Sequence, residues 1–305
     1  MNIYIPSLDN KELLDKYLKY NKTRKCEFNV ANPILWSRHY NTGFVIVDDT
    51  LVFCILNDGK PVSFTFPIGE GDVKTAFDSL VEYCENQGID FNLYLVSPEQ
   101  YSLIDEWYPD KYSIVYDRDS ADYLYESESL AYLSGKKLHG KRNHINRFLE
   151  RYPDYVYESI DDSNYMECIK LSDDWSKNNE DTDDEAVYDD MSYEHSALKF
   201  ALEHREELDM KGALIRVEGK VVAFTLGGRI TDDTFDVNFE KAYADVQGAY
   251  AMINREFVRR ELIADYKYIN REEDMGLPGL RHAKTSYQPV CLIEKGRVCK
   301  KSMPE

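Results

Sequence analysis

The chain has 305 residues and a formal net charge of −19, with 43% hydrophobic and 13% aromatic residues. This length is sufficient for two domains of ordinary size, each with its own core. A pI near 4.8 argues against a surface that coats nucleic acid, because net negative charge repels a polyanion, although a local basic groove remains compatible with it. No run of about 18 apolar residues occurs, which predicts no transmembrane helix.

The N-terminal residues and the cysteines indicate the compartment. The start, MNIYIPSLDNKELL, lacks the basic and apolar regions of a signal peptide. The six cysteines occur singly, without C-x-x-C spacing, which favours reduced thiols over disulfides or a zinc site. We therefore expect a cytoplasmic protein without a metal or cofactor. The sequence leaves its oligomeric state open.

The first half of the chain opens with an amphipathic helix at 9–20, for which Asp9 is the expected N-cap. It then shows the element order β-β-β-α-β-α-β: strands at 43–47, 51–56 and 61–66, a helix at 72–87 closed by Gly88, a strand at 91–96, a helix opened by Ser97 and Pro98, and a strand at 112–116.

The second half repeats this order without repeating the residues: strands at 212–217, 221–228 and 234–240, a helix at 246–264, a strand at 268–270, a helix at 278–287 and a strand at 289–298. A three-strand meander followed by a right-handed helical crossover places the helix N-terminus at the carboxyl end of the third strand, where open α/β sheets bind ligands. This is the element order of the GNAT acyltransferase fold, twice. We predict an α+β fold of two tandem GNAT-like domains, 1–125 and 126–305, with mostly antiparallel central sheets flanked by helices.

Two segments of opposite charge lie between the halves. Residues 135–152 form a basic helix, and residues 161–190 carry twelve acids, with a mobile loop expected at 179–190. The helix is a candidate landing site for a phosphate-bearing donor, or an interdomain helix whose cations offset the acids; a third hypothesis has the loop cover the basic patch. The expected buried stripe is Leu138, Ile145, Leu149 and Tyr152, and the candidate ligand-binding cations are Lys137, Lys141, Arg142 and His144.

Two long, irregular motifs carry a family resemblance. "GKKLHGKRNHINRFLERYPDYVYE" at 135–158 and "YINREEDMGLPGLRHAKTSYQPVCLIEK" at 268–295 resemble the C-terminal catalytic domain of the phosphatidylglycerol lysyltransferase family. The resemblance implies a tandem GNAT fold related to the Fem-type transferases, whose better-known members move an aminoacyl group from a charged tRNA to a lipid or peptide. The flippase half of the lysyltransferase is absent from this sequence, so a lipid acceptor is not implied.

The second motif supplies most candidate site residues. Arg281 and Lys284 lie one helical turn apart, a spacing that suits a phosphate or carboxylate. By resemblance, Lys284 stabilises a developing oxyanion. The alternative is a salt-bridged cap in which Glu272 and Glu273 pair with Arg281 and Lys284. The other expected substrate-binding residues of this stretch are Asn270, Arg271, Glu272 and Tyr287.

The third strand of the second half adds Asn238 and Glu240 near its end. In a GNAT layout this strand end lies beside the acyl carbonyl. Glu240 is the candidate general base for an acceptor amine or hydroxyl, and Asn238 a candidate substrate contact. The alternative is that Glu240 is simply solvated.

Acyl-CoA is disfavoured as the donor by two loops. A CoA enzyme uses free amides at the start of its crossover helix to hold pyrophosphate. Here Asp245 is the expected N-cap, which would occupy those amides, and Glu70 and Asp72 flank the corresponding loop of the first half. We therefore expect aminoacyl transfer from aminoacyl-tRNA to an amine or hydroxyl acceptor on a small molecule, peptide or lipid headgroup. The alternatives are an acyl-CoA-dependent N-acyltransferase and a non-catalytic anion-binding protein.

Overall fold

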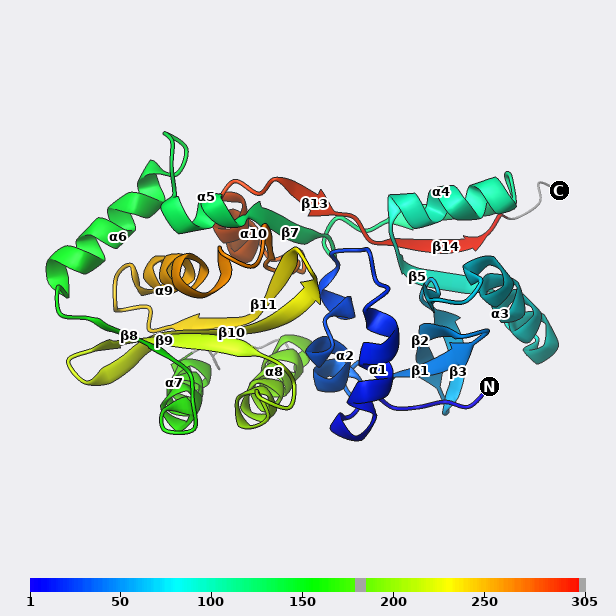
Figure 1. Cartoon of the computed structure of the whole chain (residues 1–305), viewed down its shortest axis with the longest axis horizontal. Coiled ribbons are helices and arrows are strands. Elements are labelled where there is room, and N and C mark those ends of the chain that lie inside the picture. Colours follow the sequence, from blue (N-terminus) through cyan, green and yellow to red (C-terminus); the bar gives the residue numbers. More distant parts are fainter. Residues whose placement is uncertain (179–184, 302–305) are drawn as a thin grey trace. The chain divides into compact units, whose positions relative to one another are not determined.

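Two mixed β-sheets organise the chain, one in each of two units (Figure 1). The computed structural model describes residues 1–178 and 185–301, without the side chains of 177–178 and 185–191. Unit 1 contains residues 1–122, 273–277 and 292–305, and unit 2 contains 123–272 and 278–291. Within the described ranges, no helix is both long and apolar enough to cross a bilayer.

The sheet of unit 1 has the strand order β1-β2-β3-β5-β14-β6, with β4 paired to β2. The first three strands form an antiparallel meander, and β3 meets β5 in parallel at the single register pair Phe64–Leu93. The strands are β1 (Thr42–Val47), β2 (Thr50–Asn57), β3 (Lys60–Phe64), β4 (Ile68–Gly69), β5 (Asn92–Val96), β6 (Tyr112–Tyr116) and β14 (Gly296–Lys300), and the helices are η1 (Leu8–Asn10), α1 (Lys11–Leu18), η2 (Cys26–Phe28), α2 (Ala31–Trp36), α3 (Val73–Gln87) and α4 (Pro98–Trp107).

Both faces of this sheet are covered, because successive side chains of a strand point to opposite faces. Val45 and Val52 belong to one buried cluster with Phe77 of α3. The neighbouring residue Phe53 contacts Phe28 on the opposite face, with ring centroids 6.0 Å apart. The sheet is therefore the middle layer of unit 1.

Helix ends follow local capping chemistry. Asp72 accepts a hydrogen bond from the Lys74 amide and Gly88 ends α3 at φ 65°, as the sequence predicts. The N-cap expected at Asp9 is wrong, because Asp9 lies inside the short 3-10 turn η1. The Ser7 amide donates to Asn10 Oδ1 at 3.0 Å, and Asn10 is the N-cap of α1.

The sheet of unit 2 has the strand order β13-β7-β12-β11-β10-β9-β8. Helices α5, α6 and α9 lie along one face, and α7 and α8 lie along the other (Figure 1). The strands are β7 (Asp122–Glu126), β8 (Val156–Ser159), β9 (Lys211–Val217), β10 (Lys220–Thr231), β11 (Thr234–Ala242), β12 (Tyr268–Asn270) and β13 (Cys291–Ile293), and the helices are α5 (Ser127–Tyr132), α6 (His139–Arg151), α7 (Tyr165–Asn178), α8 (Glu185–Glu203), α9 (Ala249–Phe257), the π-helical turn η3 (Val258–Leu262) and α10 (Pro278–Thr285).

The acidic segment differs from the expected loop. Helix α7 occupies much of 161–178, and residues 185–190 are the first turns of α8. The rest of the expected loop, 179–184, lies outside the described residues, as do the side chains on which the patch-covering hypothesis depends. Burial of one face of α7 against the sheet outweighs its acidic composition: Cys168 and Leu171 are 0% and 1% exposed.

Strands β11 and β12 separate soon after they meet. Their parallel pairing covers only Thr234–Asp236 against 268–270, whereas β11 continues to Ala242. A register shift against β10 places Asn238 as the extra residue between Val237, which is in register with Gly227, and Phe239, which is in register with Leu226. A bulge of this kind changes which face the following side chains occupy, and it directs Glu240 toward the α9 side.

Each sheet takes a strand from the far end of the other half. The single strand predicted at 289–298 is two strands, of which β14 pairs antiparallel with both β5 and β6 in unit 1. Strand β7, which directly follows the first half, pairs antiparallel with β12 in unit 2. The fold class is confirmed as mixed α+β with largely antiparallel sheets. Of the described C-terminal residues, 292–301 lie in unit 1, and the domain bounds 1–125 and 126–305 stay a prediction.

We expect a chain that ends at Lys295 to lose the cooperative unfolding of unit 1, because β5 and β6 would each lose the strand between them. Hydrogen exchange of the β5 and β6 amides measures this directly. A chain ending at Lys301 retains β14 and is the matched control. Unchanged protection of β5 after the shorter truncation would contradict the role given to β14.

Candidate functional site

A buried ion pair lies where β11 and β12 separate. Arg271 directly follows β12, and its Nη2 lies 2.8 Å from Oε1 of Glu240 on β11. Their side chains are 13% and 9% exposed, so water does little to screen the pair. Burial opposes the charge of Arg271, but Glu240 and two tyrosines outweigh it and raise the arginine pKa. The guanidinium of Arg271 therefore stays charged.

Asn254 of α9 holds the other oxygen of this carboxylate. Its Nδ2 donates to Glu240 Oε2 at 3.1 Å, and the residue is 1% exposed. Sequence reasoning missed Asn254. An amide within the otherwise apolar run AYAMIN of a predicted helix is the signal that could have found it, because a buried amide needs a partner.

The ring of Tyr287 contacts two cations. The Tyr287 ring centroid lies 4.9 Å from Cζ of Arg271 and 3.8 Å from Nζ of Lys141 on α6. Burial raises the pKa of Tyr287 to about 12, so its hydroxyl stays protonated. Tyr125 of β7 contacts Tyr287 edge-on, and its hydroxyl donates to the Lys284 carbonyl at 2.7 Å. These aromatic contacts hold both cations beside Glu240.

Lys141 is desolvated as well as stacked. Burial and the nearby positive charge of Arg271 lower its pKa to about 8, with Glu240 opposing the shift. Near neutral pH this lysine is mostly a cation, but it releases its proton far more readily than an exposed lysine. The site therefore combines two cations with one carboxylate.

The basic helix does not present its cations as one patch. Arg142 Nη1 donates to the carbonyls of Leu133 and Gly135, which follow α5, whereas Lys137 and His144 are exposed. Of the four cations predicted to bind a donor, Lys141 is the one that, in the part of the chain that is described, contacts the Tyr287 ring of the Glu240 site. The four cations, which the sequence predicts as one patch, therefore have different surroundings in the folded chain.

The cations of α10 lie near a different ring. Lys284 is half-buried, with Nζ 6.0 Å from the centroid of Tyr123, and Arg281 is also half-buried. The two acids of the alternative cap have other partners: Glu272 accepts from Asn238 at 3.2 Å, and Glu273 lies 3.4 Å from Lys295. The predicted roles of Arg281 and Lys284 stay predictions.

Asn238 and Asn270 organise the backbone around the strand separation. Asn238 Nδ2 donates to Asp236 at 2.9 Å as well as to Glu272. Asn270 is fully buried, and its Oδ1 accepts from the Glu272 amide at 2.7 Å. These contacts hold the bulge and the end of β12 in place.

The N-terminus of α9 has a different N-cap from the one that the sequence predicts. The expected N-cap Asp245 is wrong, because Gly248 is the N-cap of α9, with φ 89° and no side-chain hydrogen bond. A Cβ at Gly248 would lie 2.4 Å from the His144 carbonyl oxygen, so α6 packs directly on this turn. The close approach of that carbonyl disfavours a pyrophosphate at Gly248.

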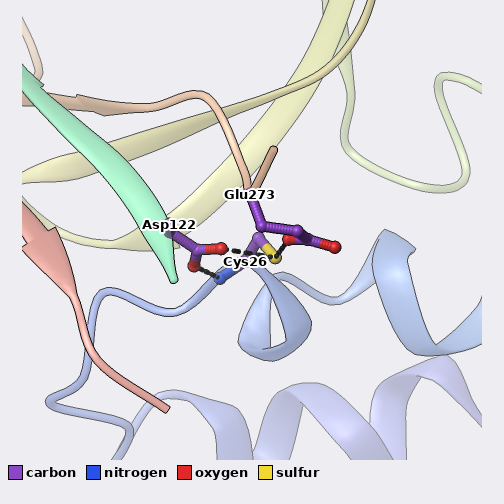
Figure 2. Close-up of side chains that lie close together, drawn as sticks. All are labelled: Cys26, Asp122 and Glu273. Carbon is purple, nitrogen blue, oxygen red and sulfur yellow. Dashed lines mark hydrogen bonds between the residues drawn. The ribbon is translucent and has the colours of Figure 1, made fainter. Parts of the chain in front are cut away.

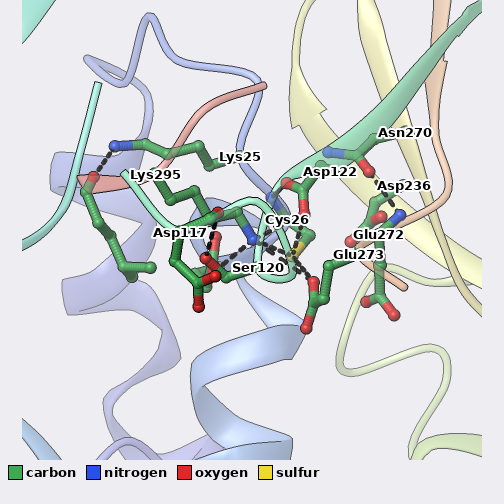
Figure 3. A network of polar contacts seen from close by, with 12 residues as sticks. Lys25, Cys26, Asp117, Ser120, Asp122, Asp236, Asn270, Glu272, Glu273 and Lys295 are labelled. Atoms are coloured by element: carbon green, nitrogen blue, oxygen red, sulfur yellow. Dashed lines mark hydrogen bonds and ion pairs between the residues drawn. The ribbon is translucent and has the colours of Figure 1, made fainter. Parts of the chain in front are cut away.

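Unit 1 contains a second cluster of ionisable groups, drawn in Figures 2 and 3. Asp122 accepts from the Cys26 amide at 3.0 Å and approaches the Cys26 thiol at 3.5 Å, with Glu273 nearby (Figure 2). Lys295 Nζ lies among them, 2.6 Å from both Asp122 and Glu27 (Figure 3). Burial opposes its charge, but these acids outweigh burial and raise the Lys295 pKa.

This cluster is better suited to the ammonium of Lys295 than to a metal. Cys26, Asp122 and Glu273 offer ligand atoms within 4.8 Å of one another. A metal-bound cysteine must be a thiolate, whereas burial raises the pKa of Cys26 well above its usual range. The ammonium already supplies the cation that Asp122, 0% exposed, requires. The cluster joins four chain segments of unit 1.

The strand order and the separation of β11 from β12 define a tandem protein of the GNAT fold class. The profile of the family "Phosphatidylglycerol lysyltransferase, C-terminal" matches residues 19–295. The chain belongs to this family, as its two long motifs indicated.

Solved structures agree with this placement. A conserved protein of unknown function from Bacteroides thetaiotaomicron is 37% identical, with a TM-score of 0.89 over 99% of this chain and 100% of that one. L-PGS from Bacillus licheniformis is 15% identical, with a TM-score of 0.64 over 99% and 94% of the two chains, which shows the shared fold.

A relative found by sequence, an uncharacterised protein from Mycoplasmoides gallisepticum, is 27% identical over 195 residues, or 62% of this chain and 60% of that protein's length.

We expect Lys141 to react with an amine acylating reagent with a midpoint near pH 8, because burial and Arg271 favour its neutral form. Competitive labelling across pH, read by mass spectrometry, measures the midpoint, and the exposed Lys60 is the internal control. Glu240→Gln should move the midpoint lower, since Glu240 raises this pKa. A Lys141 midpoint equal to that of Lys60 would contradict its buried position.

We expect Lys295→Met to destabilise the protein by about 3–5 kcal/mol at neutral pH, because the buried Asp122 carboxylate would lose its cation. Urea unfolding measures the change. The double variant Lys295→Met with Asp122→Asn should regain part of the loss, since it leaves no unpaired charge at that position. Equal stability of Lys295→Met and the unaltered protein would refute this account of the cluster.

Proposed function

We propose that this chain is an acyltransferase that moves an aminoacyl group from aminoacyl-tRNA to an amine or hydroxyl acceptor. The observation that carries the proposal is the Arg271 guanidinium, which Glu240 fixes at the separation of β11 and β12 while its Nη1 has no hydrogen-bond partner among the described residues. A buried donor without a partner is costly. A ligand oxygen that accepts from Nη1 offsets that cost.

The chemistry of acyl transfer matches this arrangement. When the acceptor attacks the ester carbonyl, a new bond to nitrogen or oxygen forms and negative charge develops on the carbonyl oxygen. Arg271 Nη1 donates to that oxygen, and the Lys141 ammonium adds a second positive charge nearby. The ester bond then breaks, and the proton from the acceptor is transferred to the departing ribose oxygen.

Glu240 takes a positioning role in this proposal. Its two oxygens are engaged by Arg271 and Asn254. These contacts favour orientation of Arg271 over the general-base role considered from the sequence. Arg281 and Lys284 on α10, together with Tyr287, remain proposed contacts of the donor. Lys137, Arg142 and His144 are proposed to help seat its phosphates.

Family membership and the closed start of α9 support aminoacyl-tRNA over acyl-CoA as the donor. Members of the family are described as phosphatidylglycerol lysyltransferases. The Gly248 turn, where a CoA pyrophosphate would bind, lies against the His144 carbonyl. The net charge of −19 restricts tRNA contact to local basic groups.

We expect Arg271→Gln to lower kcat/KM for acyl transfer by roughly 10²–10³-fold, because one donor to the developing oxyanion is lost. The assay follows loss of labelled amino acid from a mixed charged-tRNA pool with a panel of amines and polyols, and a parallel arm uses acetyl-CoA. Lys60→Met, which removes one exposed positive charge in unit 1, is the charge-matched control. Lys284→Ala tests the α10 cation under the same conditions.

Three results would count against this proposal. Transfer from acetyl-CoA but not from charged tRNA would replace the donor. Full activity of Arg271→Gln with loss in Lys284→Ala would move the oxyanion contact to α10. Binding of charged tRNA without turnover for any acceptor would favour a non-catalytic protein.

A further inference from the structure

Two buried polar atoms of the Glu240 site point to a ligand with two different hydrogen-bonding groups. In the part of the chain that is described, Arg271 Nη1 and Asn254 Oδ1 have no hydrogen-bond partner. One is a donor and the other is an acceptor. Asn254 is 1% exposed, so its oxygen is removed from bulk water. Each atom left unmatched would destabilise the fold.

The orientation of Asn254 follows from its neighbour. A carboxylate only accepts hydrogen bonds, so the amide nitrogen of Asn254 must face Glu240 Oε2. Its oxygen is then necessarily the atom that faces away from Glu240. Arg271 is fixed in the same way, with Nη2 against Oε1 and Nη1 directed elsewhere. Both side chains hold the same carboxylate, one at each oxygen, so the two unmatched atoms belong to groups fixed around Glu240.

The charges of the site select the kind of group that each atom binds. Lys141 and Arg271 approach the same Tyr287 ring, at 3.8 and 4.9 Å, and Glu240 offsets one of the two positive charges. Positive charge in excess disfavours a ligand ammonium beside Asn254. A neutral hydroxyl can donate to Asn254 without that penalty. An oxygen that gains negative charge is favoured at Arg271.

We propose that Arg271 and Asn254 form a subsite for an acylated vicinal diol: the carbonyl oxygen accepts from Arg271 Nη1, and the neighbouring free hydroxyl donates to Asn254 Oδ1. This inference rests on the acyl-transfer function proposed above and specifies what the site recognises beyond the acyl group. A thioester lacks the adjoining hydroxyl and leaves Asn254 unmatched. The subsite thus provides a physical basis for discriminating between donor classes.

Two kinds of molecule carry this chemistry, and probes distinguish them. The ribose at the 3′ end of a charged RNA has a hydroxyl beside its ester, and so does an acylated glycerol. For the first, we would use an amino acid in amide linkage to 3′-amino-3′-deoxyadenosine, which resists hydrolysis, with 2′-hydroxyl, 2′-deoxy and 2′-methoxy forms. For the second, we would use an N-acyl-3-amino-1,2-propanediol and the matching 1-propanol without the middle hydroxyl.

Calorimetric binding to the whole chain is the test. We expect the 2′-hydroxyl probe to bind roughly 5- to 150-fold more tightly than the 2′-deoxy and 2′-methoxy probes, the range expected for one hydrogen bond to a buried acceptor. Asn254→Ala should reduce this ratio to near one. Asn164→Ala removes a buried asparagine elsewhere in unit 2 and should leave the ratio unchanged.

Each outcome has a defined meaning. Equal affinity of the hydroxyl and deoxy forms in both probe series overturns the subsite, and this comparison needs no variant that could misfold. A hydroxyl preference that persists in Asn254→Ala also overturns it. A preference found only in the propanediol series assigns the diol to a glycerol-type ligand. Because binding is measured without turnover, a hydroxyl preference without transfer activity would refute the proposed function and leave the subsite intact.

Discussion

The insertion of β14 between β5 and β6 is the constraint on which unit 1 depends. An antiparallel strand that satisfies two neighbours removes two open edges at once, and here it arrives from the last residues of the described chain. Lys295, directly before β14, carries its ammonium into a group of buried acids that includes Asp122 at the start of β7. The same few residues therefore join both exchanged strands to the first half. Unit 1 cannot be completed until residues 296–300 have been made.

In unit 2 the candidate site depends on one carboxylate, that of Glu240. Glu240 faces α9 because the bulge at Asn238 shifts the alternation of β11, and it meets Arg271 because β12 ends where β11 continues. Its two oxygens fix a guanidinium and an amide, and the remaining donor and acceptor atoms of these groups are left for a ligand. Backbone irregularity, rather than an isolated reactive side chain, produces the site.

The two ionic clusters differ in their balance of charge. Around Lys295 three carboxylates, those of Glu27, Asp122 and Glu273, surround one ammonium, and Glu27 Oε2 has no hydrogen-bond partner among the described residues. Around Arg271 one carboxylate serves a guanidinium with a second cation nearby, and buried polar atoms remain unmatched. The excess of negative charge around Lys295 suits a buried ammonium, whereas the excess of positive charge around Arg271 favours an anionic or polar ligand group. The cysteine that accompanies the first cluster is buried and protonated, so it contributes packing rather than reactivity.

The sequence by itself determined the elements whose signals are local. Apolar periodicity and caps predicted α3 from Asp72 to Gly88, both meanders and the order of elements in the two halves, and the two long motifs indicated the family. Arg271, Glu240, Lys141 and Tyr287 were all among the candidate residues, but their mutual contacts were not predicted. Only the tertiary structure decided that Lys141 leaves the basic helix's surface for the Tyr287 ring, that Asn254 joins the site and that β7 and β14 exchange sheets. Those outcomes depend on contacts between residues far apart in the chain and on a one-residue bulge, and neither leaves a periodic or capping signal in a single sequence.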